Sequence, residues 1–285
     1  MKSVQLCSCF LLGLSAHAGT VVQFRTTFGD LLVELLDTEK PITVQNFLRY
    51  IDEGLYTDGF FHRSVHNFVL QGGGFAITNR NTTNSSVTAI KTYPEILNEF
   101  KVGPLVSNTR GTIAMAKTSD PNSATSQFFV NLANNAASLD DTNNSGGFSV
   151  FGNVISGTNL FDVLNSFIGS TTIYTNVLVN AGGVFRELPV LSYPKDHVAT
   201  KAELIANLVF VDITRLNIHI ESLADGTRGI AWDSTRGVTN TVEFTTQMPP
   251  VWQTLTSFAP TEIRTQVVDS ATTASNRFYR VRILR

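Results

Sequence analysis

Two segments of the chain combine hydrogen-bond donors with aromatic residues at close spacing. The first covers residues 61–75 and reads FHRSVHNFVLQGGGF, and the second covers residues 110–129 and ends in SQFF. Arg63, Gln71 and Gln127 supply the donors, while Phe68 and Phe129 supply apolar rings. Arginine carries a rigid fork of N–H donors and stays charged at physiological pH. These residue types suit a site that grips a polar group beside an apolar ring.

Most other chemistries are excluded by spacing. His62 and His66 fall in a predicted strand, where four residues span roughly 13 Å at about 3.3 Å per residue, too far for one metal ion. Gly72-Gly73-Gly74 is followed by no phosphate-loop lysine, and neither an H-E-x-x-H nor a G-x-S-x-G motif occurs. The glycine run instead predicts close backbone approach or a bulge. We therefore expect a site without metal, cofactor or nucleophile, in which His62 has a structural role.

The two segments resemble the signature blocks of the cyclophilins, the peptidyl-prolyl cis–trans isomerases. The resemblance rests on the sequence motifs FHR…F…QGG…F and SQFF. Three further segments match the family pattern in the same order: Asn46-Phe47, Asn98-Glu99 and Val150-Phe151-Gly152. The likeness covers about residues 20–215 and is closest to bacterial-type members. It implies a mainly β fold, an eight-stranded antiparallel barrel capped by two helices, and peptidyl-prolyl isomerase activity (EC 5.2.1.8).

The resemblance also assigns roles at matching positions. Arg63 becomes the donor to the prolyl nitrogen, and Gln71 bonds the substrate backbone and helps to position Arg63. Such a donor stabilises the twisted amide, whose planar forms are separated by a barrier of roughly 18–20 kcal/mol. The implied catalytic residues are Arg63, Gln71 and Phe68; the implied substrate-binding residues are Val69, Met115, Ala116, Lys117, Gln127, Phe129, Leu139 and Phe148.

Several positions depart from the family pattern. Many members carry Trp just before a Leu-Asp pair, whereas Ala137-Ser138 precedes Leu139-Asp140 here. Phe148 stands where many members have histidine, and Lys117-Thr118 replaces a common Asn-Ala pair. The arginine and the apolar socket remain, so we expect isomerase activity together with weak cyclosporin binding.

The sequence predicts that these residues are positioned mainly by β-strands. Turn residues and apolar runs predict a hairpin of strands 21–26 and 31–36. Apolar residues at helical spacing predict one helix from Pro41 to Gly54 and another from Leu160 to Gly169. The other predicted strands are 60–68, 69–75, 111–117, 126–132, 149–154 and 208–213, and two long surface segments are predicted at 76–98 and 133–147.

Composition fits a globular chain of about two domains. The 285 residues are 42% hydrophobic and 15% charged, with a net charge of −2. This balance argues against a nucleic-acid partner. Proline-containing peptides and unfolded exported proteins are the expected partners, and we expect a monomer with no membrane span.

The first 18 residues have the layout of a secretory signal peptide. Lys2 precedes an apolar run, and Ala16-His17-Ala18 forms a small-residue cleavage site before Gly19. The alternative, a membrane anchor, needs a longer apolar run of roughly 17–25 residues. Both cysteines lie in this segment, so the mature chain would hold no disulfide. We expect an exported protein, either periplasmic or extracellular, with its isomerase domain at residues 19–216.

Residues 217–285 predict a separate small β-sandwich. Short alternating stretches occur at 217–222, 229–233, 239–245, 251–255, 263–268 and 278–283. The ending RFYRVR and the spaced tryptophans resemble fibronectin-III-like modules of secreted bacterial proteins. A spacer without ligand and a surface- or glycan-binding module both remain open.

Two function classes fit the whole chain. The first is an exported foldase that accelerates proline-limited folding. The second is a binding protein that uses the groove or the C-terminal module to hold a partner. A pure binder has no need of a donor at the prolyl nitrogen, so Arg63 favours the foldase.

Overall fold

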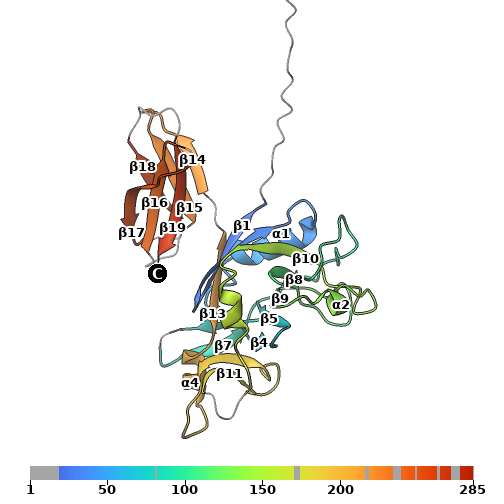
Figure 1. The fold of residues 1–285 in the computed structure, drawn as a ribbon. Helices are drawn as coiled ribbons and strands as arrows, with labels where there is room; N and C mark the ends of the chain where they lie inside the picture. The colour runs from blue at the N-terminus through green and yellow to red at the C-terminus, as the bar shows by residue number, and fades with distance from the viewer. Residues whose placement is uncertain are drawn as a thin grey trace, which may run out of the picture.

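The computed structural model describes residues 19–80, 82–169, 174–215, 218–233, 239–247, 249–261, 264–270 and 277–284. Strands dominate over helices, which confirms the predicted mainly β class (Figure 1). The signal peptide predicted at residues 1–18 lies outside the described residues. Among the described residues, no helix is both long enough and apolar enough to cross a bilayer.

The chain enters the barrel through the predicted hairpin and helix. β1 (Val21–Thr26) pairs antiparallel with β2 (Gly29–Leu35), which confirms the predicted hairpin. α1 (Pro41–Asp52) begins at a proline, which fits the first helical turn because the missing N–H has no intrahelical partner there. The ring of Phe47 on α1 packs against those of Phe24 and Phe151, so this helix covers the barrel core.

One curled antiparallel sheet forms the barrel. Its further strands are β3 (Gly59–Phe60), β4 (Arg63–Ser64), β5 (Val69–Gly72), β6 (Phe75–Thr78), β7 (Ser86–Ala89), β8 (Thr112–Met115), β9 (Phe128–Asn131), β10 (Val150–Ser156) and β13 (Phe210–Arg215). The hydrogen-bonded order is β4-β5-β9-β8-β10-β2-β1-β13-β3-β6-β7. β4 and β5 lie at one end of this order, and β3 and β6 lie near the other end. Only residues 61–62 separate β3 from β4, and only residues 73–74 separate β5 from β6, so the chain itself joins the two ends of the sheet. With each of these pairs taken as one bent strand, the barrel has the eight strands that the resemblance implies, and β7 extends it.

The bends correct the prediction of continuous strands at 60–68 and 69–75. Asn67 adopts a φ of 53°, which starts the turn into β5. Gly73 has a φ of 77°, and a Cβ there would lie 2.4 Å from the carbonyl oxygen of Ser126. A Cβ on Gly72 would lie 3.1 Å from the ring of Phe128. The glycine run therefore allows the close backbone approach that the sequence predicts.

Two predicted surface segments contain short elements, and one predicted helix is shorter than expected. Residues 76–98 include β7, whose pairing with β6 is supported by a hydroxyl contact of 2.8 Å between Thr78 and Ser86. Residues 133–147 include the one-turn helix α2 (Ala136–Leu139). The helix predicted from Leu160 to Gly169 is α3 (Leu160–Leu164). Hydroxyl-rich strands and single turns give too weak a periodicity to be predicted.

A further unit between α3 and β13 was not predicted. It consists of β11 (Thr175–Val179), β12 (Leu188–Ser192) and α4 (Lys201–Ala206). Apolar residues of this unit pack with Phe60 and Ile77 into a second core. α4 begins with a capping box, in which Thr200 and Glu203 each satisfy a backbone N–H of the other. This unit lies beside β4 and β7 in Figure 1.

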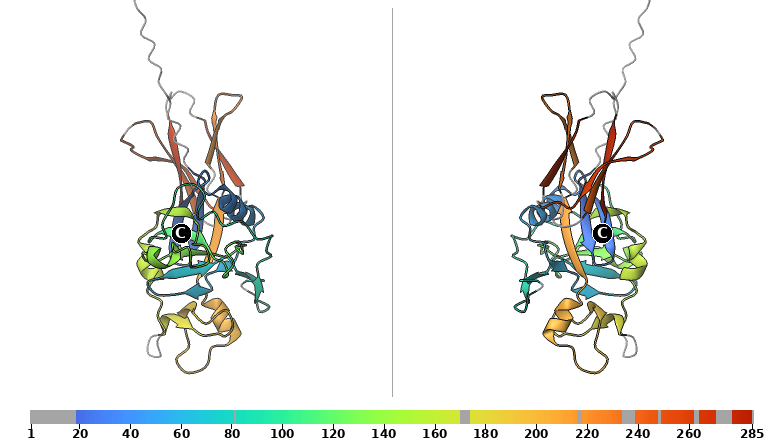
Figure 2. Two further views of the ribbon diagram at one scale, coloured as in Figure 1. Left: turned by 90° about the vertical axis from the view of Figure 1, so that its right-hand side faces the viewer. Right: turned by 90° about the vertical axis from the view of Figure 1, so that its left-hand side faces the viewer.

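The C-terminal strands form two sheets of their own. One contains β14 (Ile218–Ser222), β15 (Arg228–Asp233) and β18 (Arg264–Asp269), and the other contains β16 (Thr239–Thr245), β17 (Gln253–Phe258) and β19 (Phe278–Leu284). Each predicted strand overlaps one of these, and Figure 2 shows the two layers. Buried Trp232 packs between them with Ile230 and Val242 and donates from Nε1 to Asn240 at 2.8 Å. The boundary at residue 217 stays a prediction.

Candidate active site

Strand register places the predicted donors and an aromatic wall in one row. Arg63 on β4 lies opposite Gln71 on β5, and Gln71 lies opposite Phe129 on β9. The row continues through Ala114 on β8 to Val150 on β10. Paired residues of antiparallel strands point to the same face with Cβ atoms about 4.5–5.5 Å apart. The barrel therefore presents a cation, an amide and an aromatic ring side by side.

An apolar cluster adjoins this row. Val69, Phe129 and Leu139 are buried together, and Phe68, Ala116 and Phe148 pack against them half-exposed. The rings of Phe129 and Phe148 meet edge to face with centroids 5.8 Å apart. The structure thus brings together six of the predicted socket and groove residues.

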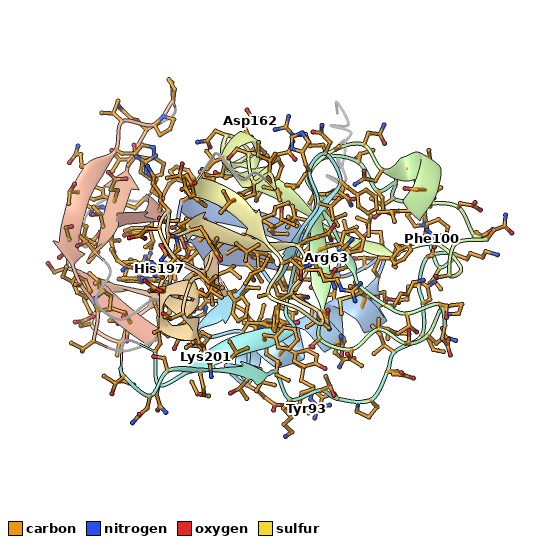
Figure 3. All side chains as sticks on the ribbon, turned by 90° about the horizontal axis from the view of Figure 1, so that it is seen from below. Arg63, Tyr93, Phe100, Asp162, His197 and Lys201 are labelled. Atoms are coloured by element: carbon orange, nitrogen blue, oxygen red, sulfur yellow. The ribbon has the colours of Figure 1, made fainter. Side chains whose placement is uncertain are left out.

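Arg63 is held by an acidic residue that the sequence analysis did not single out. Nε of Arg63 donates to Oε2 of Glu187 at 2.7 Å. The side chains are 37% and 40% exposed, so the guanidinium remains open to solvent on the barrel face. Figure 3 shows Arg63 well apart from His197 and Lys201, which belong to the region of α4.

The side chain of Gln71 bonds to Gln127, and its predicted roles toward the substrate and Arg63 stay predictions. Its Nε2 donates to Oε1 of Gln127 at 2.7 Å, which fixes the amide beside Phe129. His62, which precedes Arg63, is 3% exposed. The pKa of His62 is lowered to about 4, mainly by burial; the hydrogen bond with Gln127 opposes this shift and the charge of Arg63 adds to it. His62 is therefore neutral at physiological pH, as a structural histidine would be.

Two of the predicted substrate-binding residues, Lys117 and Met115, make contacts within the protein itself. Nζ of Lys117 donates to the carbonyl oxygen of Ser145 and lies 4.1 Å from the centroid of the Phe148 ring. Burial lowers the pKa of Lys117 to about 8. Met115 pairs with Phe128 and is buried in the main barrel core, because alternation along β8 turns it away from the face of Ala114. The structure does not bring Met115 into the row.

A buried asparagine network supports the socket. Asn131 donates to Oδ1 of Asn108 at 3.1 Å, and Asn108 donates to Oδ1 of Asp140 at 2.8 Å. Asn135 donates both to Asn131 and to the carbonyl oxygen of Phe68. These bonds tie the loop that carries Leu139 to β9 and to Phe68. Sequence analysis missed these asparagines: Asn131 lies in a predicted strand, Asn135 in a predicted surface segment and Asn108 in no predicted element, and none of these patterns indicates that a polar side chain is buried.

Two recesses of the protein are lined by residues outside the row that carries Arg63. One recess of about 830 Å³ is lined by residues of β1, β13 and α4, including Arg25 and Lys201. Another of about 940 Å³ follows α1 and the segment at Tyr93. Neither recess is lined by Arg63, Gln71 or Phe129, so both are separate from the candidate site.

Comparison with known proteins supports one family. The sequence model described as cyclophilin type peptidyl-prolyl cis-trans isomerase/CLD matches residues 21–181, more than half of the chain. A peptidyl-prolyl cis-trans isomerase of Acinetobacter baylyi is 41% identical over 160 residues, covering 55% of this chain and 79% of the relative. Peptidyl-prolyl cis-trans isomerase B of Escherichia coli is 39% identical over 148 residues, covering 50% and 82%.

A solved cyclophilin-type isomerase of Cryptosporidium parvum aligns with a TM-score of 0.44 at 20% identity, covering 70% of this chain and 98% of that one. The assignment depends on the sequence matches, which include every predicted site residue between Arg63 and Phe148. By these matches the chain belongs to the cyclophilin-type peptidyl-prolyl cis-trans isomerases.

Proposed function

We propose that the chain isomerises X-Pro bonds through donation from Arg63 to the twisted prolyl amide. The planar cis and trans forms are separated by a barrier of roughly 18–20 kcal/mol, because resonance gives the C–N bond partial double-bond character. Twisting breaks the resonance and returns a lone pair to the prolyl nitrogen. A cation aimed at that nitrogen stabilises the twisted state more than either planar state, which is the requirement for catalysis.

The other site residues hold the substrate during this rotation. The cluster around Val69, Phe129 and Leu139 would hold the proline ring, while Gln71 and the groove beside Ala116 would bond the peptide backbone. No bond is broken, so the reaction requires neither a nucleophile nor a proton transfer. Neutral His62 is accordingly assigned no acid–base step.

The register row from Arg63 through Gln71 to Phe129 carries this proposal. It places a permanent cation on β4 and an aromatic side chain two strands away on β9, on a face that remains partly exposed. Binding alone would need the apolar wall and the backbone donors. The cation at this position supports turnover.

The test is isomerisation of an alanyl-prolyl peptide by wild type and Arg63→Ala. We expect kcat/KM to fall on the order of a hundredfold, the loss typical when one preorganised donor is removed. Arg110→Ala is the matched control, because Arg110 is also a part-exposed arginine paired with a carboxylate, at 2.8 Å from Asp162. Unchanged turnover in Arg63→Ala would exclude Arg63 as the donor.

We further propose that the protein is exported and assists the folding of exported proteins. Support comes from Lys2, the apolar run that follows, and the cleavage site at Ala16-His17-Ala18. The amino-terminal sequence of protein recovered outside the cytoplasm should begin at Gly19. A chain that retains Met1 in the cytoplasm would contradict export.

A further inference from the structure

Glu187 makes two bonds to neighbouring residues of β4. Its carboxylate accepts from Nε of Arg63 at 2.7 Å, and its backbone carbonyl accepts from the N–H of Ser64 at 2.9 Å. The side chain and the main chain of one residue therefore grip the strand at the position of the arginine. Glu187 follows the segment that matches the family, which ends at residue 181.

The segment that carries Glu187 is itself firmly anchored. Two residues before it, the ring of Phe185 lies 4.8 Å from that of Phe75 and 6.3 Å from that of Phe60. The next residue, Leu188, begins β12 and is 4% exposed in the second core. The carboxylate is thus presented from a packed hairpin beside the barrel.

The contact has a specific consequence for the guanidinium. Arginine has five N–H donors, of which one is on Nε and four are on the two Nη atoms. A carboxylate on Nε restricts the rotation of a long side chain and leaves the Nη donors available to a substrate. The pair is partly solvent-exposed, so it contributes little to the stability of the fold. Its removal should therefore be readable in turnover.

We infer that Glu187 is a positioning residue for isomerisation, which orients Arg63 toward the prolyl amide through the bond to Nε. This inference rests on the proposed role of Arg63. Glu187 could also have the opposite effect and lower the activity, because its carboxylate partly offsets the positive charge that stabilises the twisted amide. Positioning predicts that activity falls when Glu187 is removed, whereas charge compensation predicts that activity rises.

The experiment compares Glu187→Ala and Glu187→Gln with wild type, using exchange NMR on an alanyl-prolyl peptide to separate binding from turnover. We expect Glu187→Ala to lower kcat and kcat/KM together by about tenfold, with the peptide affinity unchanged, because the interaction acts in the transition state. Glu187→Gln keeps an oxygen acceptor for Nε, so it should retain most of the activity. Asp162→Ala removes the exposed carboxylate of another arginine pair and serves as the control.

The double variant Arg63→Ala/Glu187→Ala separates the inference from the function on which it rests. If Glu187 acts through Arg63, its removal in the Arg63→Ala background should have no further effect. Full activity in Glu187→Ala beside an inactive Arg63→Ala would overturn the inference alone, and so would increased activity. Full activity in Arg63→Ala would overturn the proposed function and the inference with it.

Discussion

At the scale of single residues, His62 connects the site to the pH dependence of stability. The neutral imidazole lies 5.1 Å, centroid to centroid, from the ring of Phe75, and a Cβ on Gly74 would lie 3.1 Å from it. Such a packed site has little room for the water that a charged imidazole would need. Protonation of His62 in the folded protein is therefore costly.

We expect the free energy of unfolding to fall as pH is lowered from about 6.5 toward 4. The unfolded histidine takes up a proton near pH 6.5 and the folded one only near pH 4, so the unfolded state binds more protons between these values. The full effect is about 3 kcal/mol at about 1.36 kcal/mol per pH unit, and it vanishes above the unfolded pKa.

Urea unfolding of wild type and His62→Gln at pH 7 and pH 4.5 measures this effect. The variant should lose less stability between the two pH values, whatever the substitution costs at pH 7. Equal losses in the two proteins would show that His62 does not carry the dependence.

Residue types and short spacing were enough to predict much of the site. Sequence analysis singles out Arg63, Gln71 and Phe129 because they belong to the motifs that resemble the family, and the strand register places them side by side. Glu187 could not be found in this way, because 124 residues separate it from Arg63 and nothing near it in sequence marks a partner. Met115 belongs to the same motif but packs in the main core, because a local motif does not show which face of a strand a side chain takes; its role in substrate binding stays a prediction.

At the scale of elements, the glycine run between β5 and β6 is a structural requirement of the barrel. Gly73 combines a φ of 77° with a close approach to β9, where Phe128 and the Ser126 carbonyl leave no room for a Cβ. Gly182 has a similar φ of 86° with nothing within 4 Å of a Cβ. Substitution of Gly182 would therefore introduce backbone strain alone, whereas substitution of Gly73 would introduce backbone strain and steric overlap together.

We expect Gly182→Ala to cost about 1–2 kcal/mol, the price of a left-handed conformation for an L-residue. Gly73→Ala should cost more, about 3 kcal/mol or above, because β5 must also move away from β9. Thermal or urea unfolding of the two variants gives the comparison. Equal losses would mean that the barrel relaxes freely around Gly73.

Element prediction failed where periodicity is weak and succeeded where it is strong. The hairpin of β1 and β2, helix α1 and the C-terminal strands follow clear alternation or helical spacing. β11, β12 and α4 are only five or six residues long, and Pro189 lies inside β12, so their periodicity is weak, although Thr200 and Glu203 carry a capping-box signal. The predicted strands that span 60–75 are broken because tertiary closure of the barrel overrides local pattern.

At the scale of the whole molecule, the distribution of tryptophan offers a direct test of two-domain organisation. Both tryptophans, Trp232 and Trp252, lie beyond residue 216. Trp232 is 1% exposed in the core of the C-terminal sheets. Tryptophan fluorescence therefore reports on those sheets, whereas the barrel contributes phenylalanine and tyrosine.

We expect urea unfolding followed by tryptophan fluorescence to differ from unfolding followed by isomerase activity. If residues 19–216 and 217–285 fold separately, the two midpoints should differ, and Trp232→Phe should shift only the fluorescence transition. Coincident transitions in wild type that shift together in Trp232→Phe would contradict separate folding units.

The position of β13 in the barrel bears on when the enzyme can form. β13 is the last barrel strand in the chain, yet it lies between β1, the first strand, and β3. Synthesis must therefore pass residue 215 before the barrel can close. Glu187, which pairs with Arg63, is also made only shortly before that residue. Pairing of such distant segments slows folding. A chain carried unfolded across a membrane would lose nothing by this order, because its catalytic face is completed only after the entire domain has emerged.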